Sequence, residues 1–260
     1  MVFLIDMNII LFSDADCADK NTQTFFFKHT DTRYHHAKKI LKLQCGSSFK
    51  AGFINEQKGI GTVLEFSEDE FRFHFTPAAN RSDFLFPVEL IVGFPRPIQL
   101  KRCLKDIATL GVSKFHLVPT ELGEASYLQS DLASETEMQK FLIDGASQAG
   151  STLLPQVKVY RSIKHFFTET RFTDSDLKII LDVTDTAQPI HPFLQKQKLN
   201  TGAKIFLAIG NERGWTADER TLFAENHFKA CSMGSRILKT ETAITTSTAV
   251  VLSTLGFWEQ

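Results

Sequence analysis

Two short segments in the C-terminal half hold the residues best suited to chemistry. The first, AIGNERGWTADER (208–220), places Gly210 and Gly214 between an apolar run and a helix that Thr216 would cap. Glycines directly after a strand let the backbone approach a ligand closely, although an ordinary strand-to-helix turn has the same spacing. The segment contains neither the GxGxxG dinucleotide fingerprint nor the GxxxxGKS/T phosphate loop, so a generic nucleotide-binding enzyme is disfavoured.

The second segment, MGSRILKTETA (233–243), follows a strand-like run and leads into a long helix. A glycine turn, the charged residues Arg236, Lys239 and Glu241, and several hydroxyls lie close together there. A loop this rich in charge and hydroxyls exceeds what helix capping requires. A plain helix cap with solvated charges remains the alternative.

Neither a metal site nor a disulfide framework is predicted. The four cysteines lie far apart, no CxxC pair occurs, and the adjacent His35 and His36 have no third ligand nearby. A capping or RNA-contact role is therefore favoured for these two histidines. Reduced thiols fit a cytoplasmic protein.

Composition excludes several classes of protein. The chain has 260 residues, 43% of them hydrophobic and 23% charged, which fits one large or two modest domains rather than a disordered protein. The N-terminal apolar stretch is broken by Asp6 and Asn8, and the run over 243–257 is too short to cross a bilayer, so no membrane span is expected. With a formal net charge of -1, any contact with nucleic acid must come from local basic patches.

Two kinds of structure are expected to position these residues. In the N-terminal part, an apolar strand at the start and alternating segments such as FKAGFI, GIGTVLEF and EFRFHF predict a small β domain over 1–76. One helix, TRYHHAKKILKL (32–43), interrupts it. The proline-bracketed stretch 77–87 is predicted to be a linker to a second domain over 88–260.

Strand-like runs alternate with helix-like runs in the second domain, which predicts an α/β fold with a parallel sheet. The strand-like runs are VELIVGF, KFHLVP, LKIILDV, KIFLAIG and HFKACSM. Sheets of this kind bind ligands beyond the carboxyl ends of their strands. A site is therefore expected after KIFLAIG and after HFKACSM, where the two segments above begin.

Taken together, the two segments resemble the signature loops GPEGG and GxRILRTETA of the RsmE family of rRNA uridine-N3 methyltransferases, in the SPOUT superfamily. Upstream, TRYHHAKKILKLQCG is similar to HHLxxVLRLxxGD of that family, FHLVPTELGEAS to IxPLxSERS, and DGASQAGSTLLPQV to AxEQSGRxxxP. The similarity runs in order from about residue 8 to the C-terminal helix.

The resemblance implies an N-terminal PUA-like β-barrel that binds RNA, followed by a SPOUT α/β domain whose C-terminal part is a deep trefoil knot. It implies S-adenosylmethionine (SAM) as cofactor, a homodimer, and the 16S rRNA of the small ribosomal subunit as substrate, with no membrane and no metal involved. The residues that would contact the cofactor are Leu181, Asp182, Val183, Ile209, Gly210, Asn211, Glu212, Gly214, Met233, Gly234, Ser235, Ile237, Leu238 and Thr242.

The implied reaction is in-line transfer of the sulfonium methyl group to N3 of a uridine. Arg236 is the candidate for stabilising the deprotonated uracil, and Glu241 the candidate for orienting Arg236 or the base. Glu212 is a further candidate for the general base. Alternatively, Arg236 and Glu241 form a purely structural pair across the helix start.

The chain departs from the family pattern in its first loop, where GPEGG is GNERG. Asn211 replaces the proline, and Arg213 replaces the middle glycine. A Cβ at Arg213 disfavours a positive φ, so an altered loop path is expected. Two alternatives follow: a methyltransferase for a different RNA uridine, or a non-catalytic RNA-binding or ribosome-binding protein with a degenerate cofactor site.

A basic patch is the expected RNA contact. Residues 28–50 hold six Lys or Arg and a single acidic residue, a net of 6 - 1 = +5. Helical spacing would put Lys38 and Lys42 on one face, with Tyr34 and His35 available to stack on a base, although such a face is often solvated surface. The RNA-binding candidates are Arg33, His35, His36, Lys38, Lys42 and Arg96.

Overall fold

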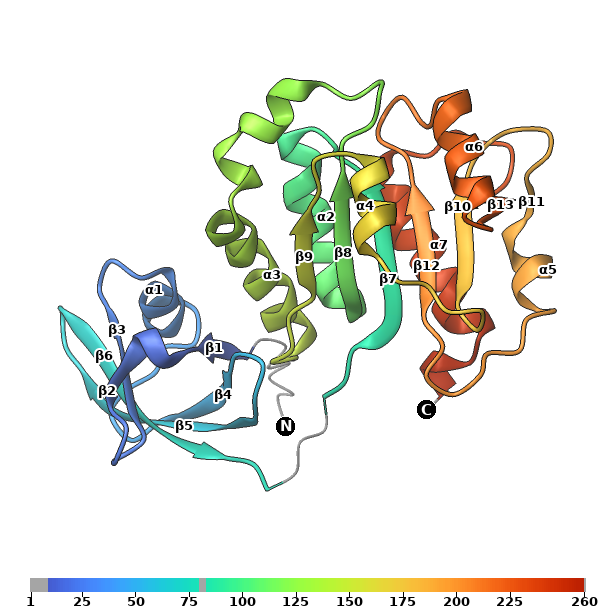
Figure 1. Ribbon diagram of the computed structural model, residues 1–260. Helices are drawn as coiled ribbons and strands as arrows, with labels where there is room; N and C mark the ends of the chain where they lie inside the picture. Colours follow the sequence, from blue (N-terminus) through green and yellow to red (C-terminus); the bar gives the residue numbers. More distant parts are fainter. Residues whose placement is uncertain (1–8, 80–82, 260) are drawn as a thin grey trace. The chain divides into compact units, whose positions relative to one another are not determined.

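The computed structural model describes residues 9–79 and 83–259 (Figure 1). The chain forms two compact units, the first made of residues up to 84 together with 146–154, and the second of the remainder. No helix in the described ranges is long and apolar enough to cross a membrane.

The segment between the two units is shorter than the predicted linker 77–87. Strand β6 continues to Pro77, and strand β7 begins at Phe86, so both ends of that stretch lie in strands. The return of residues 146–154 to the first unit was not predicted, because contacts between segments far apart in the sequence leave no local pattern.

The first unit is built on a six-stranded sheet in the order β1-β4-β5-β6-β3-β2. Its neighbouring strands are antiparallel, except that β1 pairs with β4 in parallel. Of the strand expected at the N-terminus, residues 1–8 lie outside the described part. The strands are β1 Ile10–Phe12, β2 Cys17–Asp19, β3 Thr24–Lys28, β4 Ser48–Phe53, β5 Lys58–Phe66 and β6 Glu70–Pro77.

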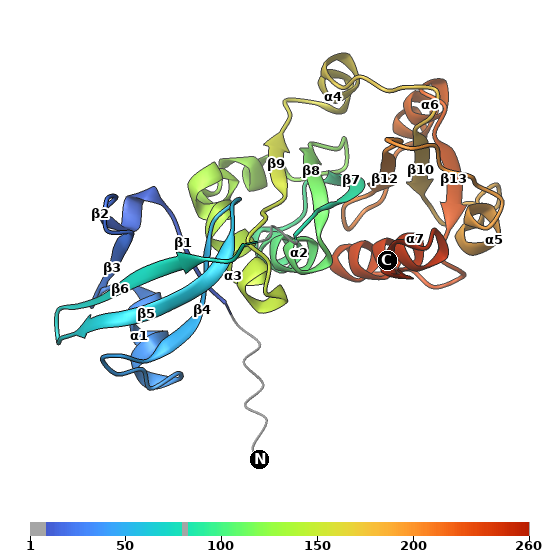
Figure 2. The ribbon, with the colours of Figure 1, turned by 90° about the horizontal axis from the view of Figure 1, so that it is seen from below.

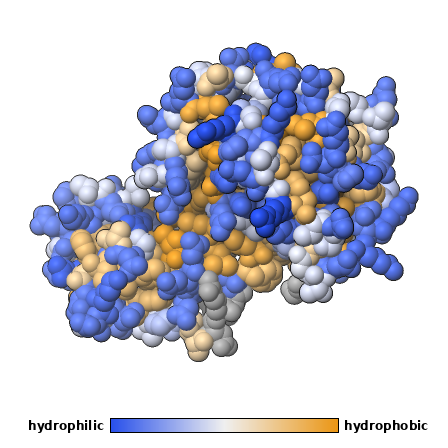
Figure 3. All heavy atoms as spheres, in the orientation of Figure 1, coloured by the Kyte–Doolittle hydropathy of each residue, from blue (hydrophilic) through white to orange (hydrophobic). Residues whose placement is uncertain are grey.

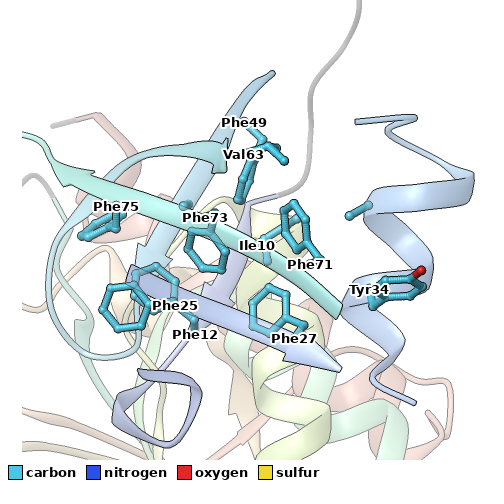
Figure 4. Close-up of a cluster of buried hydrophobic side chains, with 12 residues drawn as sticks. Ile10, Phe12, Phe25, Phe27, Tyr34, Phe49, Val63, Phe71, Phe73 and Phe75 are labelled. Carbon is cyan, nitrogen blue, oxygen red and sulfur yellow. The ribbon is translucent and has the colours of Figure 1, made fainter. Parts of the chain in front are cut away.

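Phenylalanine rings form the core of this unit (Figure 4). The ring of Phe12 lies 4.4 Å from that of Phe25 and 4.8 Å from that of Phe75, centroid to centroid. Phe71 and Phe73, which alternate with polar residues along β6, are fully buried. Phenylalanine has no polar atom to satisfy, so these rings fill the core without needing hydrogen-bond partners.

Helix α1 of this unit, Thr32–Lys39, is shorter than the predicted helix over 32–43. It begins where the Asp31 carboxylate accepts a hydrogen bond from the Arg33 N–H at 2.8 Å, and it ends at Lys39. Lys42 has a φ of 51°, a left-handed conformation that no helix contains. The prediction that Lys38 and Lys42 share a helix face is therefore wrong.

The second unit contains a seven-stranded sheet in the order β11-β13-β10-β12-β7-β8-β9. Every neighbouring pair is parallel, which confirms the predicted α/β class. The central strand β12 is buried along its length, as expected for a strand covered on both faces. The strands are β7 Phe86–Gly93, β8 Val112–Val118, β9 Gln156–Val159, β10 Leu177–Leu181, β11 Gln188–Pro189, β12 Ile205–Ile209 and β13 Lys229–Ser232.

Helices cover both faces of this sheet. Figure 2 shows α4 and α6 on one face and α2 and α7 on the other. The α-helices after α1 are α2 Pro97–Leu110, α3 Glu135–Ala149, α4 Ile163–Glu169, α5 Ile190–Leu194, α6 Ala217–Glu225 and α7 Thr240–Thr254. Short 3-10 helices occur at Asp14–Asp16, Ala125–Gln129, Asp131–Ala133 and Phe257–Glu259.

Candidate functional site

Three loops meet at the carboxyl ends of neighbouring strands. Strand β10 lies between β12 and β13 in the sheet (Figure 1), so the loops that follow these three strands share one edge. Between the loops lies a cavity of about 260 Å³. It occupies the position that the sequence predicts for a ligand site.

Most of the residues that the resemblance assigns to a cofactor line this cavity. Gly234, Ser235 and Thr242 do not, although they belong to the same loop or the helix after it. The predicted residues that do are Leu181, Asp182, Val183, Ile209, Gly210, Asn211, Glu212, Gly214, Met233, Ile237 and Leu238, together with the catalytic candidate Arg236. The lining residues that sequence reasoning missed are Arg213, Trp215, Arg220, Thr240 and Ala243.

The loop after β12 is a tight turn that needs both of its glycines. The Gly214 N–H donates to the Asn211 carbonyl at 3.0 Å, and Gly214 has a φ of 71°. A Cβ on Gly210 would lie 2.8 Å from the Gly214 Cα, closer than real contacts allow. Arg213 is not among the residues with positive φ, so this side chain is accommodated without strain. The turn therefore survives the loss of the middle glycine.

An ion pair with a buried carboxylate fixes the wall of the cavity that β10 provides. Arg220 of α6 donates through Nε to Asp182 Oδ2, and the Asp182 side chain is only 7% exposed. The other carboxylate oxygen accepts the Val183 N–H at 2.8 Å. No sequence spacing links these two segments, so Arg220 could not have been found before the fold was known.

Two residues that line the cavity each carry a buried polar group without a hydrogen-bond partner in the described part of the chain. The two groups are the indole N–H of Trp215 and the hydroxyl of Thr240, in residues that are 2% and 3% exposed. An unpaired buried group costs about 1–3 kcal/mol, so a ligand that supplies partners would recover this free energy. The prediction chose Thr242 at the start of α7, but Thr240 is the threonine that lines the cavity.

The catalytic candidates differ in how they are held. Arg236 is exposed and makes no hydrogen bond or ion pair with residues 9–79 or 83–259. Glu241 accepts a hydrogen bond from Arg102 at 3.3 Å rather than from Arg236, so a role in orienting Arg236 or the base stays a prediction. Glu212 Oε1 accepts the N–H of Arg96 at 3.0 Å, which ties the cavity loop to the start of α2.

On α2, where it packs beside α7, the surroundings of Asp106 and Cys103 disfavour the negatively charged forms of these side chains. Burial, with Glu241 nearby, raises the pKa of Asp106, although a hydrogen bond from Thr245 at 3.1 Å opposes this. Burial also raises the pKa of the Cys103 thiol, with Glu241 and Asp106 as further causes. Cys103 is therefore protonated and unreactive.

The RNA-contact candidates of the first unit divide into free and engaged side chains. All five N–H groups of Arg33 are used, by Asp16, Asp31 and the Leu11 carbonyl. Arg33 is therefore a structural residue, contrary to the prediction. Tyr34 is 2% exposed and donates to the Ser67 carbonyl, so it cannot stack on a base.

The remaining candidates stay accessible to differing degrees. His36 is half-buried, Lys38 donates to the Tyr34 hydroxyl at 3.2 Å, and Arg96, on the second unit, is exposed at the start of α2. His35, Lys38 and Lys42 are exposed. Within the described ranges no group of three or more His, Cys, Asp or Glu side chains could hold a metal ion.

Comparison with known proteins gives concordant matches. The family model for an RNA methyltransferase domain matches residues 82–252. The chain is 40% identical to the ribosomal RNA small subunit methyltransferase E of Treponema pallidum, over 98% of this chain and 94% of that protein. It is 31% identical to ribosomal RNA small subunit methyltransferase E 1 of Borreliella burgdorferi, over 86% and 91% of the two chains.

Among solved structures, one similar fold is a ribosomal RNA small subunit methyltransferase E from Neisseria gonorrhoeae bound to S-adenosyl methionine. The TM-score is 0.69 at 20% identity, and the match covers 94% of this chain and 97% of that one.

Proposed function

Because the chain belongs to the RsmE family, the ribosomal RNA small subunit methyltransferases E, we propose that it methylates N3 of a uridine in 16S rRNA with SAM as methyl donor. The observation that carries this proposal is the cavity between the three loops, which the two family motifs and the end of β10 build. The residues that line it suit an amphipathic ligand of this kind, with both apolar walls and polar edges.

The lining fits SAM in three respects. The turn from Gly210 to Gly214 lines the cavity with two residues that have no side chain, so main-chain groups can reach the ligand. The unpaired Trp215 N–H and Thr240 hydroxyl offer a donor and a donor-acceptor to its polar atoms. Leu181, Ile209 and Leu238 would pack against its apolar parts.

When bound, SAM supplies a methyl group on a positively charged sulfur, which a nucleophilic nitrogen attacks in line. Uracil N3 must lose its proton to attack. The exposed guanidinium of Arg236 stabilises the resulting anion, because no carboxylate within 9–79 or 83–259 pairs with it. Glu212 accepts the N3 proton through Oε2, since Oε1 is committed to the Arg96 N–H.

The first unit is proposed to be a PUA-like barrel that binds the RNA, through the exposed His35, Lys38 and Lys42. In the second unit, a C-terminal knot is proposed on the resemblance to the family alone.

The exposed apolar rim of the cavity supports a homodimer. Hydrophilic residues predominate on the face drawn in Figure 3. Ile237 is 86% and Val183 is 60% exposed, and both line the cavity. A second copy of the chain would cover such residues.

The test is methyl transfer to small ribosomal subunits that lack the modification. Purified protein is incubated with these subunits and methyl-labelled SAM, and the rRNA is then digested to nucleosides for mass spectrometry. The expected product is 3-methyluridine at one position. Transfer to another RNA would support the alternative uridine target, whereas no transfer to any RNA would contradict the proposal.

A further inference from the structure

The side chain of Asn211 connects the cavity loop to the segment 120–124 that follows β8. We infer that Asn211 and Thr120 form a lock that holds the loop in its binding shape, so that Thr120 is a positioning residue for the cofactor without touching it. This inference rests on the proposed function, because it assigns the loop to SAM. Thr120 does not line the cavity.

The lock is a buried hydrogen bond between Asn211 and Thr120, and the Asn211 side chain makes a second hydrogen bond within its own turn. Asn211 Nδ2 donates to Thr120 Oγ1 at 2.8 Å, and both residues are 8% exposed. The same amide accepts the Arg213 N–H through Oδ1 at 2.9 Å. One side chain thus shapes its own turn and anchors that turn to a neighbouring segment.

Two glycines leave no free space around this pair. A Cβ on Gly93, at the end of β7, would lie 2.6 Å from the Asn211 backbone nitrogen and 2.8 Å from Thr120 Cγ2. A Cβ on Gly123 would lie 3.0 Å from Thr120 Oγ1 and 3.3 Å from Asn211 Nδ2. The amide and the hydroxyl are therefore held in one arrangement by close packing.

Two further contacts fasten the same segment to the cavity loop and α6. Glu219, which is 3% exposed, accepts the Glu121 N–H at 2.9 Å. Arg213 pairs with Glu124 at 3.1 Å, and both side chains are more than half exposed, so this pair contributes little. The buried contacts, rather than the surface ion pair, carry the coupling.

The family pattern explains why this chain needs the lock. A proline in GPEGG restricts the loop through its ring, whereas Asn211 has no such restriction and depends on a partner. Thr120 supplies that partner. The effect of Thr120 on SAM affinity should therefore disappear when Asn211 is replaced by proline.

The first experiment measures SAM affinity by calorimetry in the full-length protein. Thr120→Val removes the hydroxyl and keeps the shape, and we expect it to weaken SAM binding by about tenfold, since it leaves a buried donor unpaired. Thr120→Ser keeps the hydroxyl and should bind like the wild type. In an Asn211→Pro background, Thr120→Val should change the affinity less than about twofold.

Equal affinity of Thr120→Val and wild type would overturn the lock, as would an equal loss in both backgrounds. A second readout is independent of SAM: hydrogen exchange of the peptide 208–216 should be faster in Thr120→Val than in wild type and unchanged in Thr120→Ser. Unchanged exchange in Thr120→Val would also overturn the lock. If wild type binds no SAM, the proposed function fails, and the exchange result still decides the lock.

Discussion

Three arginines line the cavity, and the structure distinguishes their roles. Arg220 is held by the buried Asp182, and Arg213 reaches away to Glu124. Arg236 is exposed and has no partner among the described residues. A guanidinium that is not paired with a carboxylate keeps its positive charge available to a substrate anion. Arg236 is therefore the side chain proposed to stabilise the uracil anion.

Replacing Arg236 with alanine should lower kcat by roughly 100- to 1000-fold, the range found when one stabilising donor is removed. The melting temperature and SAM affinity should stay close to wild type, since the side chain has no hydrogen-bond or ion-pair partner in the described part of the chain. Arg236→Lys should recover part of the rate because it restores charge without the planar fork. Single-turnover kinetics on small subunits measure this, and an unchanged kcat would contradict the role.

Replacing Thr240 with valine should act in opposite directions on stability and binding. Without ligand, the buried hydroxyl is unpaired, so its removal should leave the melting temperature unchanged or raise it. SAM binding should weaken by about fivefold to tenfold through loss of one hydrogen bond. Thr242→Val, at an exposed position outside the cavity, is the matched control. Equal effects of the two variants on affinity would refute the assignment.

The sequence motifs located most of the lining residues because two of the three loops are nearly continuous stretches of chain. Trp215 and Thr240 were missed for a different reason. Whether a residue at a helix start points to solvent or to a cavity depends on the packing of that helix, which no local spacing shows. Arg33 was misassigned because its guanidinium is fully engaged by Asp31 within the patch and by Asp16 and the Leu11 carbonyl outside it.

Strands β7 and β8 are joined by a buried polar pair, and a half-exposed lysine just before β12 adds to it. Glu89 on β7 bonds to His116 Nε2 of β8 at 2.7 Å and to Lys204 Nζ, just before β12, at 2.8 Å. His116 Nδ1 lies 2.8 Å from the Tyr160 hydroxyl. Burial lowers the pKa of His116, so the ring is neutral at pH 7, with Tyr160 donating to Nδ1 and Nε2–H donating to Glu89.

This network should make stability depend on pH. Burial opposes ionisation of Glu89, yet hydrogen bonds from His116 and Lys204 outweigh it and lower the pKa from 4.5 to about 2. A depressed carboxyl pKa stabilises the fold above the unfolded value of 4.5, and this contribution is lost as the pH falls toward 2.

Glu89→Gln should therefore lower the free energy of unfolding by roughly 3 kcal/mol at pH 7. Its deficit relative to wild type should shrink progressively below pH 4.5. Urea unfolding of both proteins at several pH values measures this. The exposed ion pair of Lys140 with Glu137 offers a control, since Glu137→Gln should have little effect at any pH. A deficit independent of pH would contradict the assignment.

Periodicity predicted the long elements and missed the short ones. The strands β7, β8, β10 and β12 are largely buried apolar runs, and α2 and α7 end close to the predicted residues. Strand β9 and helix α4 are short and lack strong alternation, so the sequence showed no signal for them. The helix predicted at α1 was too long because the helical spacing of apolar residues continues past Lys39, where the helix ends.

The two units are proposed to divide the work, with RNA held by the first and the methyl donor by the second. The division into units has a signal in the sequence, where β alternation changes to strand–helix alternation. A knot and a dimer leave no such signal in the sequence. Both depend on how helices and strands, once formed, thread past or pack against each other. Only the resemblance to a family supplied them.

Changing Lys38, Lys39 and Lys42 together to alanine should weaken RNA binding and flatten its salt dependence. Removing one lysine–phosphate interaction should reduce the slope of log affinity against log salt by about 0.7–0.9. SAM affinity should not change. Lys196→Ala with Lys198→Ala, exposed on the second unit, is the control. Filter binding at several salt concentrations measures this, and an unchanged slope would exclude the patch as an RNA contact.

The most direct test of the cavity as a cofactor site is a calorimetric titration of SAM into the purified, cofactor-free protein without RNA. We expect one binding event with a Kd near micromolar, about -8 kcal/mol. Binding should be abolished in Gly210→Ala, whose Cβ would press on the Gly214 backbone. Absence of heat with both SAM and S-adenosylhomocysteine would contradict the assignment and favour a non-catalytic RNA-binding protein.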